Sequence, residues 1–312
     1  MGGYCRPTPV DNYFLFPMPS RLGLVCITHS PQVRFRTITR TRLLQNSEDE
    51  QRALLTALYR DNLGRLDTAL SYCTGENIAL YRIPSSLFPF YDAEIGRQAM
   101  TELADQVAEV GARANALKVR LVMHPDQFVV LNSESAKVVE NSIAILQMHA
   151  DIMDLLQQPR SPWALIEIHG GKSGRARELV DAIGRLPDAI RLRLGLENDE
   201  YAYSAEEIAD ICMAAGVPMV FDAHHHIVHE NLPDYEDPGI AAMLARARAT
   251  WADPAQQLVH ISNGRSAFNN RGHADLIEVM PSAFDAAPWI EVEAKFKEEA
   301  IRKLRLASPA YA

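Results

Sequence analysis

The amino-acid sequence predicts a single-domain α/β protein built as a (β/α)₈ TIM barrel. Eight short runs rich in Val, Ile and Leu recur along the 312 residues, and segments with helical spacing separate them. An ionisable side chain also lies at or just after the end of several runs. Near-continuous apolar strands that alternate with helices indicate parallel strands covered on both faces. Eight such units in about 300 residues are typical of a barrel.

The predicted elements follow one another along the whole chain. The first four strands are expected at 22–27 (LGLVCI), 78–83 (IALYRI), 120–124 (RLVMH) and 163–169 (WALIEIH). The last four are expected at 193–198 (RLGLEN), 218–224 (PMVFDAH), 257–262 (QLVHIS) and 289–295 (WIEVEAK). Helical spacing is clearest at 138–157 and 204–216. Because no repeat or linker divides the chain, we expect one barrel domain over 21–312 and a loosely attached extension over 1–20.

Composition narrows the class of protein. The four cysteines are far apart and form no CxxC pair, which argues against a disulfide framework and a thiolate zinc site. No apolar run reaches the roughly 18 residues needed to span a bilayer. Residues 1–20 lack the basic start and sustained apolar stretch of a signal peptide. We therefore expect a cytoplasmic protein in which any metal has nitrogen and oxygen ligands.

Three consecutive histidines follow an apolar run in the segment VPMVFDAHHHIVHEN, residues 217–231. One interpretation is a core strand capped by a polar turn. The other is a metal site, in which Asp222 at the strand end and His225 in the following loop ligate neighbouring ions. His224 and His226 are then expected to pack or to form hydrogen bonds around the ligands.

The wider pattern favours metal. In a barrel, catalytic groups lie where strands end and the βα loops begin. The third to eighth predicted strands, and the loop after the seventh, place there His124, His169, Glu197, Asp222, His225, His260, Glu293, His273 and Asp275. Converging buried ionisable groups without a counter-ion would cost several kcal/mol each. Divalent metals supply that charge, and imidazole and carboxylate ligands suit Mn²⁺, Zn²⁺ or Fe²⁺.

Seven short motifs in a fixed order indicate a family resemblance. They are HPDQF (124–128), HGGKSG (169–174), LEND (196–199), FDAHHH (221–226), HISNG (260–264), HAD (273–275) and EAK (293–295). From about Arg21 to Leu304 the sequence resembles the UV damage endonuclease family. The resemblance implies a barrel related to endonuclease IV with two or three metals, commonly manganese, Zn²⁺ and Mg²⁺ being alternatives. It also implies a DNA nick immediately 5′ of a UV photoproduct.

The resemblance also assigns ligands and a lesion probe. It implies one metal held by His124, His169 and Glu197, and a second surrounded by Glu197, Asp222, His260 and Glu293. A third would be held by His225 and His273, with Asp275 as a further candidate. Glu197, Asp222 and Glu293 would then be catalytic. Gln127 and Phe128 match the residues that the family inserts into the duplex at the lesion, although Phe128 could instead be an ordinary aromatic residue under a loop.

Three departures from the family pattern concern the outer parts of this site. Leu258 replaces a lysine two residues before the seventh-strand histidine, so no carboxylated lysine can bridge metals there. At the second strand the sequence reads LFPFYDA, which lacks a histidine and leaves Asp92 as the nearest substitute. Leu24 and Thr28 replace an aromatic residue and an asparagine. Lesion preference and occupancy of the third metal site are the properties these changes affect.

The formal net charge of −9 is unusual for a protein that binds nucleic acid. Basic residues nevertheless gather in the loops after the first, fourth and seventh strands, at Arg34, Arg36, Arg40, Arg42, Lys172, Arg175, Arg177, Arg265 and Arg271. Three dications would change −9 to −3 and make the mouth more positive than the rest. We expect Arg34, Arg36 and Lys172 to contact DNA, with Lys295 as a further phosphate contact; the alternative is ordinary solvated loop residues.

These observations predict a metal-dependent DNA repair endonuclease that leaves 3′-hydroxyl and 5′-phosphate ends. We expect a cytoplasmic, nucleoid-associated monomer that acts on damaged double-stranded DNA. One alternative is a sugar isomerase or epimerase of the xylose-isomerase-like barrels, which also place His and carboxylate ligands on two metals. The other is a non-catalytic barrel that binds damaged DNA, suggested by Leu258 and the missing second-strand histidine.

Overall fold

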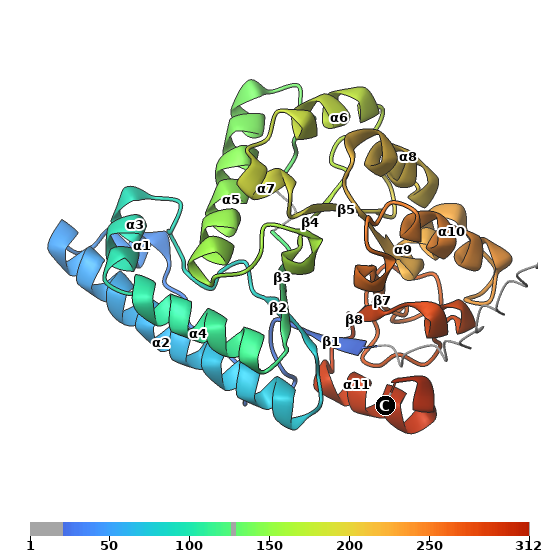
Figure 1. The fold of residues 1–312 in the computed structure, drawn as a ribbon, viewed down its shortest axis with the longest axis horizontal. Coiled ribbons are helices and arrows are strands. Elements are labelled where there is room, and N and C mark those ends of the chain that lie inside the picture. The colour runs from blue at the N-terminus through green and yellow to red at the C-terminus, as the bar shows by residue number, and fades with distance from the viewer. Residues whose placement is uncertain (1–20, 126–128, 312) are drawn as a thin grey trace, which may run out of the picture.

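A closed barrel of eight parallel strands forms the centre of the molecule (Figure 1). The computed structural model describes residues 21–125 and 129–311. Each strand pairs with its neighbours in the sequence, and β8 pairs with β1 to close the barrel. The strands are β1 (Arg21–Val25), β2 (Leu80–Ile83), β3 (Arg120–Met123), β4 (Ile166–His169), β5 (Leu194–Glu197), β6 (Met219–Asp222), β7 (Leu258–Ile261) and β8 (Trp289–Val292). The predicted fold class and the eight predicted strands are confirmed.

Helices surround this barrel on its outside (Figure 1). They are α1 (Arg40–Leu43), α2 (Glu48–Gly75), α3 (Glu94–Thr101), α4 (Ala104–Ala116), α5 (Ala136–Leu155), α6 (Ala176–Gly184), α7 (Asp188–Arg191), α8 (Ala205–Ala215), α9 (Ala223–Glu230), α10 (Pro238–Arg248) and α11 (Glu298–Ala307). The helices predicted at 138–157 and 204–216 correspond to α5 and α8. Among the described residues, no helix is both long and apolar enough to cross a membrane.

Two apolar layers hold the fold together. The larger core lies between the outward-facing strand residues and the helices, with Leu121, Ile166 and Leu196 among its members. A smaller cluster fills the lower barrel interior and includes Leu258 and Trp289. Side chains two positions apart on a strand point to the same side. The inward-facing positions therefore change from apolar to ionisable along the strands, toward the end where the metal ligands are expected.

The histidine run corrects one detail of the sequence analysis. The sixth strand ends at Asp222, and α9 begins directly at Ala223, so His225 lies in a helix rather than in a loop. The physical reason is a helix cap: Asp222 Oδ1 accepts a hydrogen bond from the backbone N–H of His225 at 2.7 Å. The D-x-x-H spacing therefore starts a helix. That helix presents His225 to the barrel mouth in a fixed orientation.

Candidate metal centre

Glu197 is the centre of the barrel mouth. It is the last residue of β5 and is 1% exposed. Its Oε2 atom lies 3.0 Å from His124 Nε2 and 3.9 Å from His169 Nε2. Its Oε1 atom lies 3.2 Å from Nδ1 of both His225 and His260. Each oxygen of one carboxylate thus faces two imidazoles, the arrangement expected of a group that joins two ions.

Charge around Glu197 keeps it ionised. Burial alone would raise its pKa, but the nearby imidazoles of His260 and His169 hold the pKa well below its ordinary value. Burial would lower the pKa of His225, whereas Asp222 and Glu197 raise it well above the usual range. Burial lowers the pKa of His169. The surrounding imidazoles therefore favour the charged form of the Glu197 carboxylate.

Asp222 and its neighbours contain buried atoms without hydrogen-bond partners. Asp222 Oδ1 caps α9, while Oδ2 makes no hydrogen bond with the described residues. His169 Nδ1 and His260 Nδ1 are in the same condition. A buried polar atom without a partner is costly, and a divalent ion would satisfy several at once. Nitrogen and carboxylate-oxygen donors of this kind fit a divalent metal.

The candidate ligand atoms form compact groups. His124, His169 and Glu197 offer atoms within 4.8 Å of one another, as do Glu197, Asp222 and His225. A further group contains Asp222, His260 and Glu293. Of the seven residues expected at strand ends and in the histidine run, each therefore belongs to at least one group.

The residues expected around a third ion are more dispersed. His273 Nδ1 lies 3.8 Å from Glu293 Oε2, and its ring centroid is 6.5 Å from that of His225. Asp275 is exposed and belongs to none of the compact groups found among the described residues. Asp92, the expected substitute at the second strand, lines a separate cavity with His149. His225 is grouped with Glu197 and Asp222, at 3.2 and 3.9 Å from its Nδ1 atom, and not with His273 among the described residues.

A second layer of ionisable residues lies beneath the mouth, and the sequence analysis did not identify it. Glu167, His260 and Glu291 form a fully buried group, with His260 Nε2 at 2.8 Å from Glu167 Oε2 and 2.7 Å from Glu291 Oε2. The signal was present in the sequence. Glu167 precedes His169 by two positions, and Glu291 precedes Glu293 by two. In a strand that spacing places both side chains on the same side.

Arg82 provides the counter-charge for this layer. Its guanidinium contacts Glu291 and lies 2.6 Å from Glu293 Oε1 through Nη1. Burial would raise the pKa of Glu291, but Arg82 and His260 lower it to about 2. Burial, together with Glu291, raises the pKa of Glu167. His260 therefore has one ring nitrogen among the lower carboxylates and the other beside Glu197.

The remaining histidines of the run hold the surrounding loops. His224 Nδ1 lies 2.7 Å from the Tyr235 hydroxyl, and its Nε2 donates to the Asn270 carbonyl oxygen at 2.9 Å. His226 is buried against the ring of Phe221. As expected, both pack outside the ligand cluster. Asn198 adds a brace between β5 and β6, since its side chain bonds both the N–H and the C=O of Asp222.

Only some of the residues expected to contact DNA lie in the described part of the chain. Gln127 and Phe128 lie outside the described residues. Arg34 donates to the carbonyl oxygens of Thr28 and His29. Arg36 pairs with Asp61 at 3.1 Å, and Lys172 pairs with Glu134 at 3.2 Å. Each of these three cations therefore has a partner within the chain.

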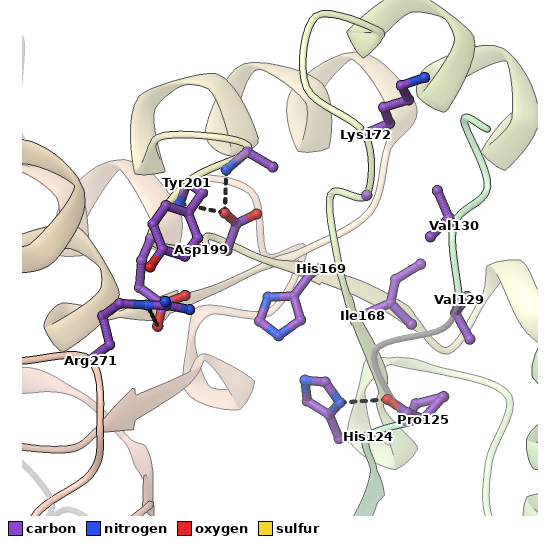
Figure 2. Close-up of a pocket in the computed structure, with 13 residues that line it drawn as sticks. His124, Pro125, Val129, Val130, Ile168, His169, Lys172, Asp199, Tyr201 and Arg271 are labelled. Atoms are coloured by element: carbon purple, nitrogen blue, oxygen red, sulfur yellow. Dashed lines mark hydrogen bonds and ion pairs between the residues drawn. The ribbon is translucent and has the colours of Figure 1, made fainter. Parts of the chain in front are cut away.

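An open cavity of about 500 Å³ adjoins the ligand cluster. His124 and His169 form its floor, and Figure 2 shows Lys172 on one side and Tyr201 with Arg271 on the other. Part of its wall is apolar, from Val129, Val130 and Ile168. The cavity therefore lies directly beside two of the candidate ligands, His124 and His169.

The fold and the site together define a TIM barrel with a candidate multinuclear metal centre at the carboxyl ends of its strands. A family model described as UV-endonuclease UvdE matches residues 20–311. The chain therefore belongs to the UV-endonuclease family UvdE, and the resemblance stated from the sequence is confirmed. Membership supports a DNA repair endonuclease for UV damage.

Similar proteins agree with this assignment. The chain is 54% identical over 286 residues to a UV DNA damage endonuclease of Nostoc sp. (strain PCC 7120), covering 91% of this chain and 89% of that protein. It is 51% identical over 292 residues to the UV DNA damage endonuclease of Deinococcus radiodurans, covering 93% and 96%. The alignments span nearly the whole of each protein.

Solved structures place the fold. The crystal structure of SacUVDE has a TM-score of 0.77 and 25% identity, covering 92% of this chain and 99% of that chain. A D-tagatose 3-epimerase-like protein has a TM-score of 0.54 and 11% identity, covering 93% and 96%. At that identity the second likeness concerns the fold alone.

Proposed function

We propose that this protein is a metal-dependent DNA repair endonuclease that nicks the strand immediately 5′ of a UV photoproduct. The observation that carries the proposal is Glu197, one buried carboxylate between four imidazoles, in a member of the UV-endonuclease family. The cut would add water across the P–O3′ bond. The water oxygen joins the phosphorus, and a proton passes to the departing oxygen, which leaves 3′-hydroxyl and 5′-phosphate ends.

The residues present fit a cluster of divalent ions. His124, His169 and Glu197 would hold one, and Glu197, Asp222, His260 and Glu293 a second, with His225 and His273 toward a third and Asp275 as its outer candidate. Mn²⁺ is the first candidate, and Zn²⁺ and Mg²⁺ are alternatives. Such ions, when bound, supply Lewis-acid activation of a phosphodiester and of water.

The protein's own residues prepare the site for an anionic substrate. Glu197 and Asp222 orient the surrounding imidazoles. Asn198 fixes the backbone of Asp222 against β5. Without bound cations these carboxylates would repel a phosphate. Lys172 and Lys295 are candidates for further phosphate contacts. DNA binding at this mouth therefore depends on cation loading, despite the overall charge of −9.

Selection of damaged DNA is assigned to Gln127 and Phe128, which lie outside the described residues. An inserted side chain must separate stacked bases, and that separation costs least where a lesion has already weakened stacking. Arg34 and Arg36, in the loop after β1, would approach the duplex backbone.

We place the protein in the cytoplasm, with the nucleoid, as a monomer.

The two alternatives remain distinguishable from this proposal. A sugar epimerase would share the fold, but the relatives that are 54% and 51% identical over the aligned residues are described as UV DNA damage endonucleases. A non-catalytic barrel would lack the compact ligand groups, which are present here. Neither alternative accounts for both observations.

The decisive experiment compares nicking of a UV-irradiated duplex with nicking of the same duplex before irradiation. We expect cleavage of the irradiated duplex alone, stimulation by Mn²⁺, and loss of activity with EDTA that Mn²⁺ restores. End-group analysis should give a 3′-hydroxyl and a 5′-phosphate. Equal cleavage of both duplexes would refute lesion selectivity, and activity that resists exhaustive chelation would refute metal dependence.

A further inference from the structure

Tyr201 and Arg271 form an exposed pair at the rim of the metal centre. The Arg271 guanidinium carbon lies 4.0 Å from the centre of the Tyr201 ring. The tyrosine is 60% exposed, and the arginine side chain is 58% exposed. Both residues line the cavity whose floor contains His124 and His169 (Figure 2). Solvent or a ligand can therefore reach the pair directly beside the candidate ligands.

The stacked geometry leaves the hydrogen-bonding edge of Arg271 available. A guanidinium over a ring uses its flat face, while its N–H donors point outward in its plane. The two terminal nitrogens of Arg271 make no hydrogen bond with any residue that the structure describes. In this respect it differs from Arg34 and Lys172, which have partners within the chain. Planar paired donors of this kind match the oxygens of a phosphate.

Hydrogen bonds fix the backbone at Tyr201 and next to Arg271. Asp199 accepts a hydrogen bond from the backbone N–H of Tyr201 at 2.7 Å, two residues after the end of β5 at Glu197. On the other side, His224 fixes the carbonyl of Asn270, the residue before Arg271. An exposed side chain anchored in this way loses less freedom on binding than a free one.

Glu200 connects the pair to the metal centre. Its Oε1 atom lies 3.9 Å from Arg271 Nε and 3.8 Å from His225 Nε2. The carboxylate is largely buried, whereas the guanidinium extends into solvent. The contact involves Nε and does not use the terminal nitrogens. Arg271 is thus oriented from two directions, by a ring on its face and by a carboxylate on its inner edge.

We propose that Arg271 binds a phosphate of the DNA strand next to the one that is cut, and that Tyr201 is the positioning residue that holds its guanidinium flat. This inference rests on the proposed function, because it assigns a substrate contact to the same site. It gives a function to an exposed cation whose ion pair with the described residues is long, 3.9 Å to Glu200, and which lies against an aromatic ring. The contact belongs to binding rather than to bond cleavage.

The test uses the full-length, metal-loaded enzyme and one UV-irradiated duplex. Single-turnover nicking gives the half-saturating enzyme concentration and the maximal rate, measured from about 50 to about 200 mM NaCl. For Arg271→Ala we expect half-saturation to rise about tenfold, the maximal rate to change little, and the salt slope to fall by about 1, as for one lost phosphate contact. Arg271→Lys should retain the salt slope while losing part of the affinity.

Variants of Tyr201 separate positioning from a merely structural role. Tyr201→Phe should match the wild type, because the ring remains. Tyr201→Ala should approach the affinity of Arg271→Ala, and the double variant should be no worse than Arg271→Ala alone. Arg185→Ala is the matched control, since this exposed arginine follows α6 at the opposite end of the barrel. Its half-saturation and salt slope should not change.

Three negative results have different meanings. If the wild type nicks neither irradiated nor intact duplex, the proposed function fails and this inference fails with it. If the wild type is active and Arg271→Ala keeps the same half-saturation and salt slope, only the phosphate contact is overturned. Equal damage by Tyr201→Ala in the presence and absence of Arg271 would overturn the positioning role.

Discussion

The charges of two buried arginines inside the barrel are stabilised by different kinds of partner. Arg120 begins β3 and donates to three carbonyl oxygens, those of Pro162, Trp163 and Gln256, at 2.8 to 3.0 Å. Its guanidinium also lies within 5.9 Å of the ring centres of Trp163, Trp251 and Trp289. Arg82, nearer the mouth, instead contacts the carboxylates of Glu291 and Glu293.

The two arginines mark two ends of the barrel interior. We call the region around Arg120 the closed end, and the region around Arg82 and the barrel mouth with Glu197 the working end. Around Arg120, neutral dipoles and rings satisfy one charge, although burial lowers its pKa to about 10. Around Arg82, carboxylates outnumber the guanidinium, and Glu291 Oε1 and the nearby Asp222 Oδ2 lack hydrogen bonds with the described residues. The first arrangement is complete without a ligand. The second leaves negative charge and unsatisfied atoms, which suits a region that receives cations.

The largest effect should come from the centre of the working end. We predict that Glu197→Ala abolishes nicking, because the carboxylate between four imidazoles cannot be replaced by a neighbour. Activity on an irradiated duplex and metal content should fall together. Glu206→Ala serves as the control, since this exposed glutamate on α8 pairs only with Arg246 among the described residues. Retention of more than about a tenth of wild-type nicking would falsify the bridging assignment.

A smaller effect should come from the layer beneath. We predict that Glu291→Gln weakens Mn²⁺ binding by about 10- to 100-fold, because a charged partner of His260 Nε2 is removed while the ligand atoms remain. Calorimetric titration and the Mn²⁺ dependence of nicking both measure this change. Saturating Mn²⁺ should restore most of the activity. A folded variant with unchanged affinity would show that this layer serves packing alone.

The sequence was sufficient for the fold and for the mouth, because both repeat simple patterns. Eight apolar runs identified the strands, and ionisable residues at their ends identified Glu197 and its imidazoles. The layer with Arg82 and Glu291 was missed because these residues lie inside strands, where a lone charge looks like an exposed position. The placement of His225 in α9 was missed because strand and helix adjoin without a loop. Pairings such as Arg271 with Tyr201 join distant loops and required coordinates.

At the closed end we predict a loss of stability without a loss of metal affinity. Arg120→Met removes the donors for three partly buried carbonyls and should lower the free energy of unfolding by about 3 kcal/mol. Urea unfolding in the presence of a chelator measures this quantity. Mn²⁺ affinity at a temperature well below the transition should match the wild type. Arg82→Met should instead change the Mn²⁺ affinity more than it changes the free energy of unfolding. Similar Mn²⁺ affinities for the two variants would contradict the contrast between the two ends.

The smallest effect concerns Leu258, where the two ends meet on a single strand. Leu258 is buried against Trp289 and Trp251 in the lower cluster, whereas His260, two residues later on the same side of β7, belongs to the mouth. Leucine offers no ligand atom, and His273 and Asp275 belong to no compact group formed by the residues that the structure describes. We therefore predict two firmly held ions and a weaker third in Mn²⁺-saturated enzyme, with nicking intact.

Elemental analysis before and after gel filtration in metal-free buffer measures this difference, because only the weakly held ion should be lost. His273→Ala should remove that weak component and leave the other two, whereas His124→Ala should deplete a firmly held ion and the activity with it. Three ions retained through filtration would mean that another side chain, such as Asp275, completes the third site. In that case the apolar end of β7 has no influence on the mouth above it, and the two ends are independent.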